Sequence, residues 1–237
     1  MSFSTITESI KNLSDIINKI APIEKVYLIG PIENSDVKNI DFNKNDLIFY
    51  IDGGLNFYRQ YFTNPAEIPL EREIFIGDGD SINSQGQQHL DKLAHTLLPT
   101  DKSYSDLEAA LMAIEKSFAN AEACSLQAIN FLGGRQDHHF ANILSFYKVL
   151  SRKLNIKNIE VDNRMTIINT GSYCFRYHGS ISLFTFDEAK VSITGQAKYL
   201  LENQTLSSFS SHGLSNEVDG DVEITTDKVL ILFRNEV

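Results

Sequence analysis

Hydrophobic and polar positions alternate in two different ways along this chain, and the change falls near residue 155. Before it, short apolar runs alternate with segments whose apolar residues recur every three or four positions, which is typical of strands alternating with helices. After it, short strand-like segments are separated by turn residues such as Asn169-Thr-Gly, His178-Gly and Asp219-Gly. The pattern predicts an α/β region with a mostly parallel sheet, followed by an all-β region that forms a β-sandwich or a partial barrel.

The first region begins with a predicted amphipathic helix that ends near Pro22, and polar residues 32–46 are predicted to form a loop. Capping boxes at Thr5-x-x-Glu8 and Ser105-x-x-Glu108 mark two of the helix starts. The predicted helices span residues 5–20, 86–97, 105–118 and 137–152, and the predicted strands span 25–29, 47–51, 74–76 and 126–132.

The second region is predicted to contain short strands at 159–162, 165–168, 173–177, 181–186, 190–194, 222–225 and 229–233. Because no Pro/Ser-rich linker separates the two regions, we expect them to pack against each other. The predicted division is an N-terminal helical extension at 1–24, an α/β domain at 25–155 and a β-sandwich at 156–237.

Three of the predicted strands end on clusters of glycine and charged residues, which are Asp52-Gly53-Gly54, Gly77-Asp78-Gly79-Asp80 and Gly133-Gly134-Arg135. Ligands of parallel sheets collect outside the carboxyl ends of the strands, so we expect these clusters to meet at one rim. In extended backbone Asp78 and Asp80 point to the same side, where a hard cation such as Mg²⁺ relieves their repulsion. An acidic surface turn is the alternative interpretation of this stretch.

Two further positions suit phosphate chemistry. Asp106 falls in the first turn of a predicted helix, where backbone N–H groups point toward a bound anion; plain helix capping is its alternative role. Arg135 follows two glycines and precedes a helix, which suits a guanidinium that binds phosphate oxygens; a surface ion pair with Asp137 is its alternative role. His138 and His139 are adjacent in a predicted helix, so at most one of them can face the site.

Composition narrows the class of protein. The 237 residues have 42% hydrophobic and 22% charged positions, which is ordinary for a globular chain. The formal net charge of -10 argues against a nucleic-acid or anionic-membrane surface, and no apolar run is long enough for a membrane span or signal peptide. Cys124 and Cys174 form no disulfide framework, which indicates the cytoplasm. The histidine spacing disfavours zinc, and the P-loop and dinucleotide motifs are absent from the sequence.

Five blocks, in order, resemble the thiamine pyrophosphokinase family. They are Asp52-Gly-Gly, Gly77-Asp-Gly-Asp-Ser81, Pro99-x-x-Lys102-x-x-Ser105-Asp106-x-Glu108, Gly133-Gly-Arg-x-Asp-His138 with Ala141-Asn142, and Gly213-Leu-Ser-Asn216. The resemblance covers roughly residues 26 to 233. It implies an α/β catalytic domain followed by a β-sandwich, in a homodimer. It also implies transfer of the pyrophosphoryl group of ATP to the hydroxyl group of thiamine, which gives thiamine diphosphate and AMP.

The resemblance also implies roles for individual residues. Mg²⁺ would be bound by Asp78, Asp80 and Asp106, which together with Arg135 would be the catalytic residues. The ATP side would consist of Asp52, Gly53, Gly54, Lys102, Arg135, Asp137 and His138. Ser215 and Asn216 would line the thiamine pocket, and with no Trp in the chain we expect Tyr199 or Phe209 to stack on the vitamin. Ser103 stands where the family usually has an aspartate, and either Asp78 or Asp106 could take the proton of the alcohol.

Three alternative functions use the same residues. A pyrophosphokinase for another heterocyclic alcohol, such as a pterin, would keep the metal rim and change the pocket. A nucleotide or thiamine sensor would bind without turnover. A metal-dependent phosphohydrolase would release ADP or inorganic phosphate, whereas a pyrophosphokinase releases AMP.

Overall fold

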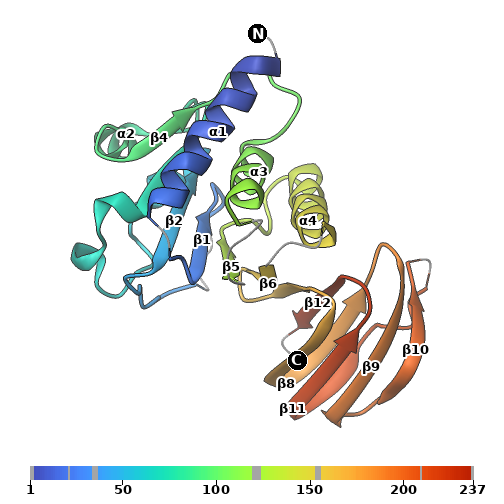
Figure 1. Ribbon diagram of the computed structural model, residues 1–237. Coiled ribbons are helices and arrows are strands. Elements are labelled where there is room, and N and C mark those ends of the chain that lie inside the picture. Colours follow the sequence, from blue (N-terminus) through green and yellow to red (C-terminus); the bar gives the residue numbers. More distant parts are fainter. Residues whose placement is uncertain are drawn as a thin grey trace.

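The first half of the chain forms a parallel sheet at the centre of Figure 1, in the order β6-β5-β1-β2-β3-β4. The computed structural model describes residues 3–20, 22–33, 37–118, 124–152, 156–208 and 210–235. The parallel strands are β1 (Lys25–Ile29), β2 (Asp46–Ile51), β3 (Glu73–Gly77), β4 (Ala94–Leu97), β5 (Cys124–Ile129) and β6 (Ile156–Val161). The strand order reverses between β1 and β5, which is where ligands of such sheets usually bind.

Both faces of the parallel sheet are covered, which explains why β2 is buried at every position. On one face Val26, Leu28 and Phe49 share a core with helices α1 (Phe3–Lys19), α3 (Asp106–Phe118) and α4 (Gln136–Ser151). On the other face the alternate residues Tyr27, Ile48 and Tyr50 pack against α2 (Ser84–Leu90) and the segments 37–42 and 52–68. The second segment includes the short 3-10 helices η1 (Asp52–Phe57) and η2 (Pro65–Glu67), and η3 (Leu70–Arg72) comes after it.

The second half is antiparallel and contains β7 (Met165–Ile168), β8 (Gly171–Phe184), β9 (Glu188–Ala197), β10 (Leu201–Ser207), β11 (Asn216–Thr226) and β12 (Leu230–Asn235). The long strand β8 belongs to two ladders, because residues 171–181 pair with β11 and residues 180–184 pair with β12. Alternate side chains of these strands bury a separate core that includes Ile181, Val191 and Ile224. The fold class predicted from the sequence is therefore confirmed.

The two halves are joined through the β6–β7 hairpin, since β6 pairs in parallel with β5 and in antiparallel fashion with β7. β12 then pairs with β7, which returns the end of the chain to this junction. Among the described residues, the strands from β10 to β4 therefore form one continuous hydrogen-bonded sheet, and Figure 1 shows its two halves.

Several predicted boundaries were wrong. The predicted helix 86–97 is the short helix α2 followed by β4, an edge strand with an alternating burial pattern. The predicted turns at His178-Gly and Asp219-Gly lie inside β8 and β11, where glycines at positions 179 and 220 have φ values of 151° and 139°. β10 was not predicted, because most of its side chains are exposed and it lacks an alternating apolar face. The first helix begins at Phe3 rather than Thr5.

No helix in the described part of the chain is both long enough and apolar enough to cross a membrane. Both cysteines are free, and Cys124 is buried whereas Cys174 is exposed. Burial raises the pKa of the Cys124 thiol to about 11, so this thiol remains protonated near neutral pH.

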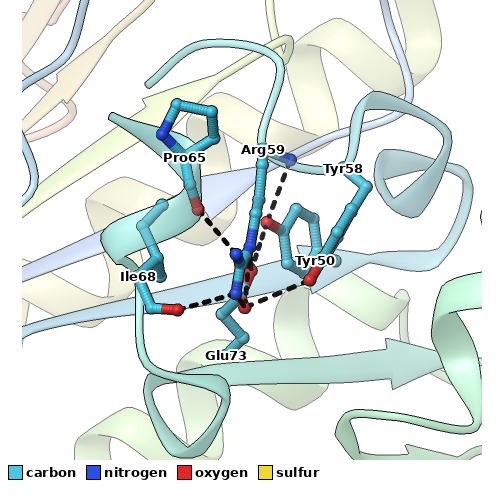
Figure 2. A network of polar contacts seen from close by, with 6 residues as sticks. All are labelled: Tyr50, Tyr58, Arg59, Pro65, Ile68 and Glu73. Carbon is cyan, nitrogen blue, oxygen red and sulfur yellow. Dashed lines mark hydrogen bonds and ion pairs between the residues drawn. The ribbon is translucent and has the colours of Figure 1, made fainter. Parts of the chain in front are cut away.

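A buried ion pair braces the segment between β2 and β3 (Figure 2). The side chain of Glu73, at the start of β3, is fully buried, and it pairs with Arg59, whose side chain is 16% exposed. The Arg59 guanidinium also donates to the carbonyl oxygens of Pro65 (2.6 Å) and Ile68 (2.7 Å). The Tyr50 hydroxyl donates to Glu73 Oε1 at 2.9 Å and accepts from the Arg59 backbone N–H at 3.3 Å.

These contacts stabilise a backbone conformation of Arg59 that is unfavourable by itself. Arg59 has a φ of 55°, in the left-handed region that costs free energy for a residue with a side chain. The Tyr58 hydroxyl donates to Glu73 Oε2 at 3.4 Å. Burial and the neighbouring Glu73 carboxylate raise the pKa of Tyr58 to about 12, so this hydroxyl stays protonated. The network therefore fixes the loop that joins the carboxyl end of β2 to the start of β3.

We predict that Glu73→Ala lowers the free energy of unfolding by about 3 kcal/mol or more, because it leaves the Arg59 guanidinium without its carboxylate in a buried site. Urea denaturation followed by circular dichroism measures this change. The matched control is Asp221→Ala, which removes a bidentate pair with Arg176 at the surface, and its urea midpoint should equal that of the wild type. Equal midpoints for both variants would contradict a stabilising role for the buried pair.

Candidate functional site

The carboxyl ends of the parallel strands bring five loops to one edge of the sheet. β1 leads into Gly30-Pro31, β2 into Asp52-Gly53-Gly54, β3 into Asp78 and β5 into the loop that starts at Asn130. β4 leads through 98–105 into α3, which begins at Asp106. Two of the three clusters predicted to share a rim, those at Asp52 and Asp78, meet there, and Gly133-Gly134-Arg135 follows a strand that ends at the same edge.

Three carboxylates converge at this rim. Asp52, Asp78 and Asp106 each have a carboxylate oxygen within 4.8 Å of the others, and all three residues are half-buried. The loops can approach this closely because position 77 is glycine: a Cβ there would lie 2.7 Å from the Asp52 Cα. Asp52 itself has a φ of 47°, which turns its backbone away from β2 and into η1.

Asp80 lies outside this cluster, although the sequence predicted that it joins Asp78 on one side of an extended strand. The strand ends at Gly77, and Gly79 has a φ of 81°, so the chain turns between the two aspartates. The Asp80 backbone N–H donates to Asp78 Oδ1 at 3.3 Å, and its exposed carboxylate accepts from the Ser81 hydroxyl at 2.8 Å. Asp52 takes the third position in the cluster.

Lys102 neutralises part of the acidic charge. Its Nζ lies 3.1 Å from Asp106 Oδ1 and 3.5 Å from Asp78 Oδ2, and it donates to the carbonyl oxygen of Pro99 at 3.1 Å. The Lys102 side chain is only 6% exposed. Burial acts to lower the pKa of this ammonium, but the contacts with Asp106 and Asp78 outweigh it and the pKa rises, so Lys102 stays charged.

The acidic cluster retains unused capacity for a cation. Asp52 Oδ1 is buried and accepts no hydrogen bond from any described residue. Burial raises the pKa of the Asp106 carboxyl, with Lys102 acting in the opposite direction. Carboxylate oxygens that are close together, partly buried and not fully paired are suitable ligands for a hard divalent cation. Asp52, Asp78 and Asp106 could therefore hold one.

The loop after β5 carries the predicted phosphate-binding arginine. Arg135 is 71% exposed and forms a bidentate pair with Asp137, with N–O distances of 2.6 and 3.2 Å. The pair lowers the pKa of Asp137. His138 is exposed at the start of α4, whereas His139 turns back and accepts the Gly133 backbone N–H on Nδ1 at 3.0 Å. Arg135 thus makes the surface contact that was its alternative role, and its guanidinium remains accessible to an anion.

A second concave surface lies in the antiparallel half, close to the predicted vitamin-binding segment. A cavity of about 520 Å³ is lined by residues that include Leu183, Tyr199, Leu201, Gly213 and Asn216. The Asn216 side chain is buried and forms two hydrogen bonds with the Tyr199 backbone, at 2.9 and 2.7 Å.

Ser215 and Gly213 fix the loop beside that cavity. Ser215 has a φ of 56°, and its backbone N–H donates to the Ser182 hydroxyl at 3.1 Å. The Gly213 carbonyl oxygen accepts from the Leu183 backbone N–H at 2.8 Å, so this loop is held against β8. The structure therefore brings Tyr199, Ser215 and Asn216 together, while Phe209 lies outside the described residues.

Two contributions to the rim were not predicted from the sequence. Asp52 was assigned to the ATP side rather than to the metal, because nothing in the sequence gives the distance between the loops after β2 and β3. Asp162 was not singled out at all, yet its buried carboxylate accepts backbone N–H groups of the loop after β5. An aspartate in a turn is too common for its sequence position to indicate this contact.

Comparisons with known protein families cover both halves. A family model described as "Thiamin pyrophosphokinase, catalytic domain" matches residues 40–158, and one described as "Thiamin pyrophosphokinase, vitamin B1 binding domain" matches residues 160–231. A curated relative, the thiamine pyrophosphokinase of Bacillus subtilis (strain 168), is 31% identical over 160 residues, which are 64% of this chain and 70% of that protein.

Solved structures show the same fold. A crystal structure of thiamine pyrophosphokinase from Bacillus subtilis superposes with a TM-score of 0.66 at 23% identity, covering 90% of this chain and 100% of that chain. Yeast thiamin pyrophosphokinase superposes with a TM-score of 0.63 at 18% identity, covering 93% of this chain and 88% of that chain.

We predict that Asp52→Asn lowers the affinity for Mn²⁺ at least about tenfold, because it removes one charged oxygen ligand from the cluster. Electron paramagnetic resonance of Mn²⁺ titrated into the substrate-free protein measures the affinity without any turnover. Asp80→Asn is the matched control and should change the affinity much less. An equal or larger loss in Asp80→Asn would place Asp80 among the ligands instead.

Proposed function

Since the chain belongs to the thiamin pyrophosphokinase family, we propose that it transfers the pyrophosphoryl group of ATP to the hydroxyl group of thiamine, which gives thiamine diphosphate and AMP. The observation that carries this proposal is the ordered match of a catalytic and a vitamin B1-binding family model to the two halves of the fold. ATP is the co-substrate, and a divalent metal ion accompanies it in this family. Transfer to another heterocyclic alcohol, a sensor without turnover and a phosphohydrolase are not favoured by these matches.

We propose Mg²⁺ as the metal, held by Asp52, Asp78 and Asp106. The donor set supports this choice, because carboxylate oxygens at a rim open to substrate suit a cation that also binds phosphate oxygens. When bound, the ion would supply charge neutralisation of the phosphates, and a cation 4 Å from a phosphate charge contributes about 4 kcal/mol at an effective dielectric constant of 20.

The protein side chains would act mainly by positioning. Lys102 is buried between Asp78 and Asp106 and keeps the cluster from expanding in the absence of substrate. Arg135 is accessible at the start of α4, where its guanidinium can exchange Asp137 for phosphate oxygens as the bond to AMP breaks. His138 is exposed in the first turn of α4, directly after Asp137. In-line transfer of this kind needs aligned reactants and electrostatic stabilisation of the phosphate charge rather than a covalent enzyme intermediate.

The vitamin side would be the cavity at Tyr199, Gly213 and Asn216 in the antiparallel half, with Ser215 in the loop beside it. The two family models meet between residues 158 and 160, which supports a catalytic domain at 25–155 and a thiamine-binding domain at 156–237, with 1–24 as an extension. In the structure β6 (residues 156–161) pairs in parallel with β5 on one side and in antiparallel fashion with β7 on the other, so the sheet changes from parallel to antiparallel at this strand. Two free cysteines support a cytoplasmic location.

A homodimer is the assembly that the cavity surroundings favour. Tyr199, Leu200 and Leu214 are 57%, 61% and 45% exposed around it, and large apolar side chains grouped at a pocket are typical of a covered surface. We propose that a second copy covers them and closes the vitamin pocket.

We predict that incubation with ATP, Mg²⁺ and thiamine yields thiamine diphosphate and AMP in equal amounts, measured by liquid chromatography with mass detection. Asp78→Asn should lower turnover at least about 100-fold, because it removes a ligand at the rim while the fold, checked by circular dichroism, is retained. Formation of ADP or inorganic phosphate instead of AMP would exclude pyrophosphoryl transfer.

We predict that Leu200→Glu converts the dimer to a monomer in sedimentation velocity and raises the KM for thiamine at least about fivefold, since it buries a charge in the contact. Leu70→Glu is the matched control, because Leu70 is 46% exposed in η3 of the other half, and it should leave both properties unchanged. A wild-type protein that sediments as a monomer at micromolar concentration would reject the dimer.

A further inference from the structure

The loop between β5 and α4 is held by the protein's own side chains before any ligand arrives. The loop runs from Asn130, which has a φ of 70° and is fully buried, to Arg135 at the start of α4. Its three leading backbone N–H groups, those of Asn130, Phe131 and Leu132, all point at one carboxylate. Successive N–H groups of this kind form a small concavity that binds anions.

That carboxylate belongs to Asp162, which is distant in the sequence and only 1% exposed. Its Oδ1 accepts from the Asn130 N–H at 2.5 Å, and its Oδ2 accepts from the Phe131 N–H at 2.9 Å and the Leu132 N–H at 2.6 Å. Asp162 lies in the turn between β6 and β7, the hairpin that joins the two halves of the fold. Its φ of 48° and its N–H bond to the Ala128 carbonyl oxygen, at 2.9 Å, fix its own backbone.

The rest of the loop is anchored from α4. The Gly133 N–H donates to His139 Nδ1 at 3.0 Å, and Asn142 Nδ2 donates to the Phe131 carbonyl oxygen at 3.2 Å. The backbone donors from 130 to 133 are therefore engaged within the protein, and a phosphate cannot use them without displacing the buried Asp162 carboxylate or the His139 imidazole. The part of the loop that can contact a phosphate is its end, at Gly134 and the Arg135 guanidinium.

We propose that Asp162, assisted by His139, is a positioning residue for the ATP side of the reaction: it holds the β5–α4 loop so that Arg135 meets the phosphates without a prior rearrangement of the loop backbone. This inference rests on the proposed role of Arg135. Two glycines with φ of 102° and 64° precede Arg135, and glycine has a large conformational freedom to lose. A fixed point immediately before them confines that freedom, and a confined binding group loses less entropy on binding.

The test compares Asp162→Asn with the wild type. The amide keeps the shape of the side chain but replaces one acceptor oxygen by a group that cannot accept an N–H. We expect the KM for ATP to rise roughly tenfold, with the KM for thiamine and kcat changed less than about twofold. Calorimetric titration with a non-hydrolysable ATP analogue should show the same loss of affinity. Thr226→Val is the matched control: Thr226 is 4% exposed and bonds two backbone groups in the β11–β12 turn, so its loss costs stability without touching the loop.

A double-mutant cycle with Arg135→Ala separates positioning from general stabilisation. If Asp162 acts through Arg135, the effect of Asp162→Asn on ATP affinity largely disappears in the Arg135→Ala background. A full-size effect in that background, or an equal rise in both KM values, would overturn the inference. Arg135→Ala with unchanged ATP affinity would also overturn it, while thiamine diphosphate formation would still uphold the overall function.

A second variant keeps the inference open to refutation if Asp162→Asn does not fold. His139→Phe removes the acceptor of the Gly133 N–H from a half-buried helix position, where it should be tolerated. It should raise the KM for ATP selectively, by a smaller factor than Asp162→Asn. Unchanged ATP affinity in a folded His139→Phe protein would show that the anchors do not serve the nucleotide.

Discussion

Mutual repulsion among Asp52, Asp78 and Asp106 is the constraint around which the α/β half is built. Two unit charges at the 4.8 Å limit of this cluster oppose each other by about 3 kcal/mol at an effective dielectric constant of 20. Left free, the loops would move apart. They are held together by a close glycine contact at 77, by the buried Lys102 and by the Arg59–Glu73 network that secures the chain between β2 and β3. Holding these like charges together lowers the stability of the folded protein. A bound cation removes the repulsion, so its binding stabilises the site.

The sequence was informative where one local rule decides the outcome. Continuous apolar runs gave β1, β2 and β3 almost to the residue, because strands buried on both faces have no alternative use for such runs. Ser105 was identified as a helix cap, and its hydroxyl does accept the Glu108 N–H at 3.1 Å. The same rule places Asp106 in the first turn of α3, whereas its grouping with Asp78 was expected from the family resemblance.

The sequence was uninformative where the distances between loops determine which residues come together. Asp80 was preferred to Asp52 as a metal ligand because the backbone from Asp78 to Asp80 was assumed to be extended. The positive φ at Gly79 shows that this assumption was wrong. The anchor at Asp162 depends on pairing between β5 and β6, which places a turn residue beside a loop about 30 positions earlier. Short exposed strands such as β4 and β10 depend on neighbouring strands rather than on their own apolar pattern.

The continuous ladder through β5, β6, β7 and β12 limits how the molecule can move. Hinge closure, in which two lobes swing about a flexible connection, would have to break backbone hydrogen bonds at the β6–β7 junction. Motion that admits or releases small molecules therefore falls to the surface loops and, in the dimer proposed above, to the second copy. In such an architecture local gating sets how fast a bound molecule leaves, while the spacing between the acidic cluster and the cavity beside Asn216 stays constant.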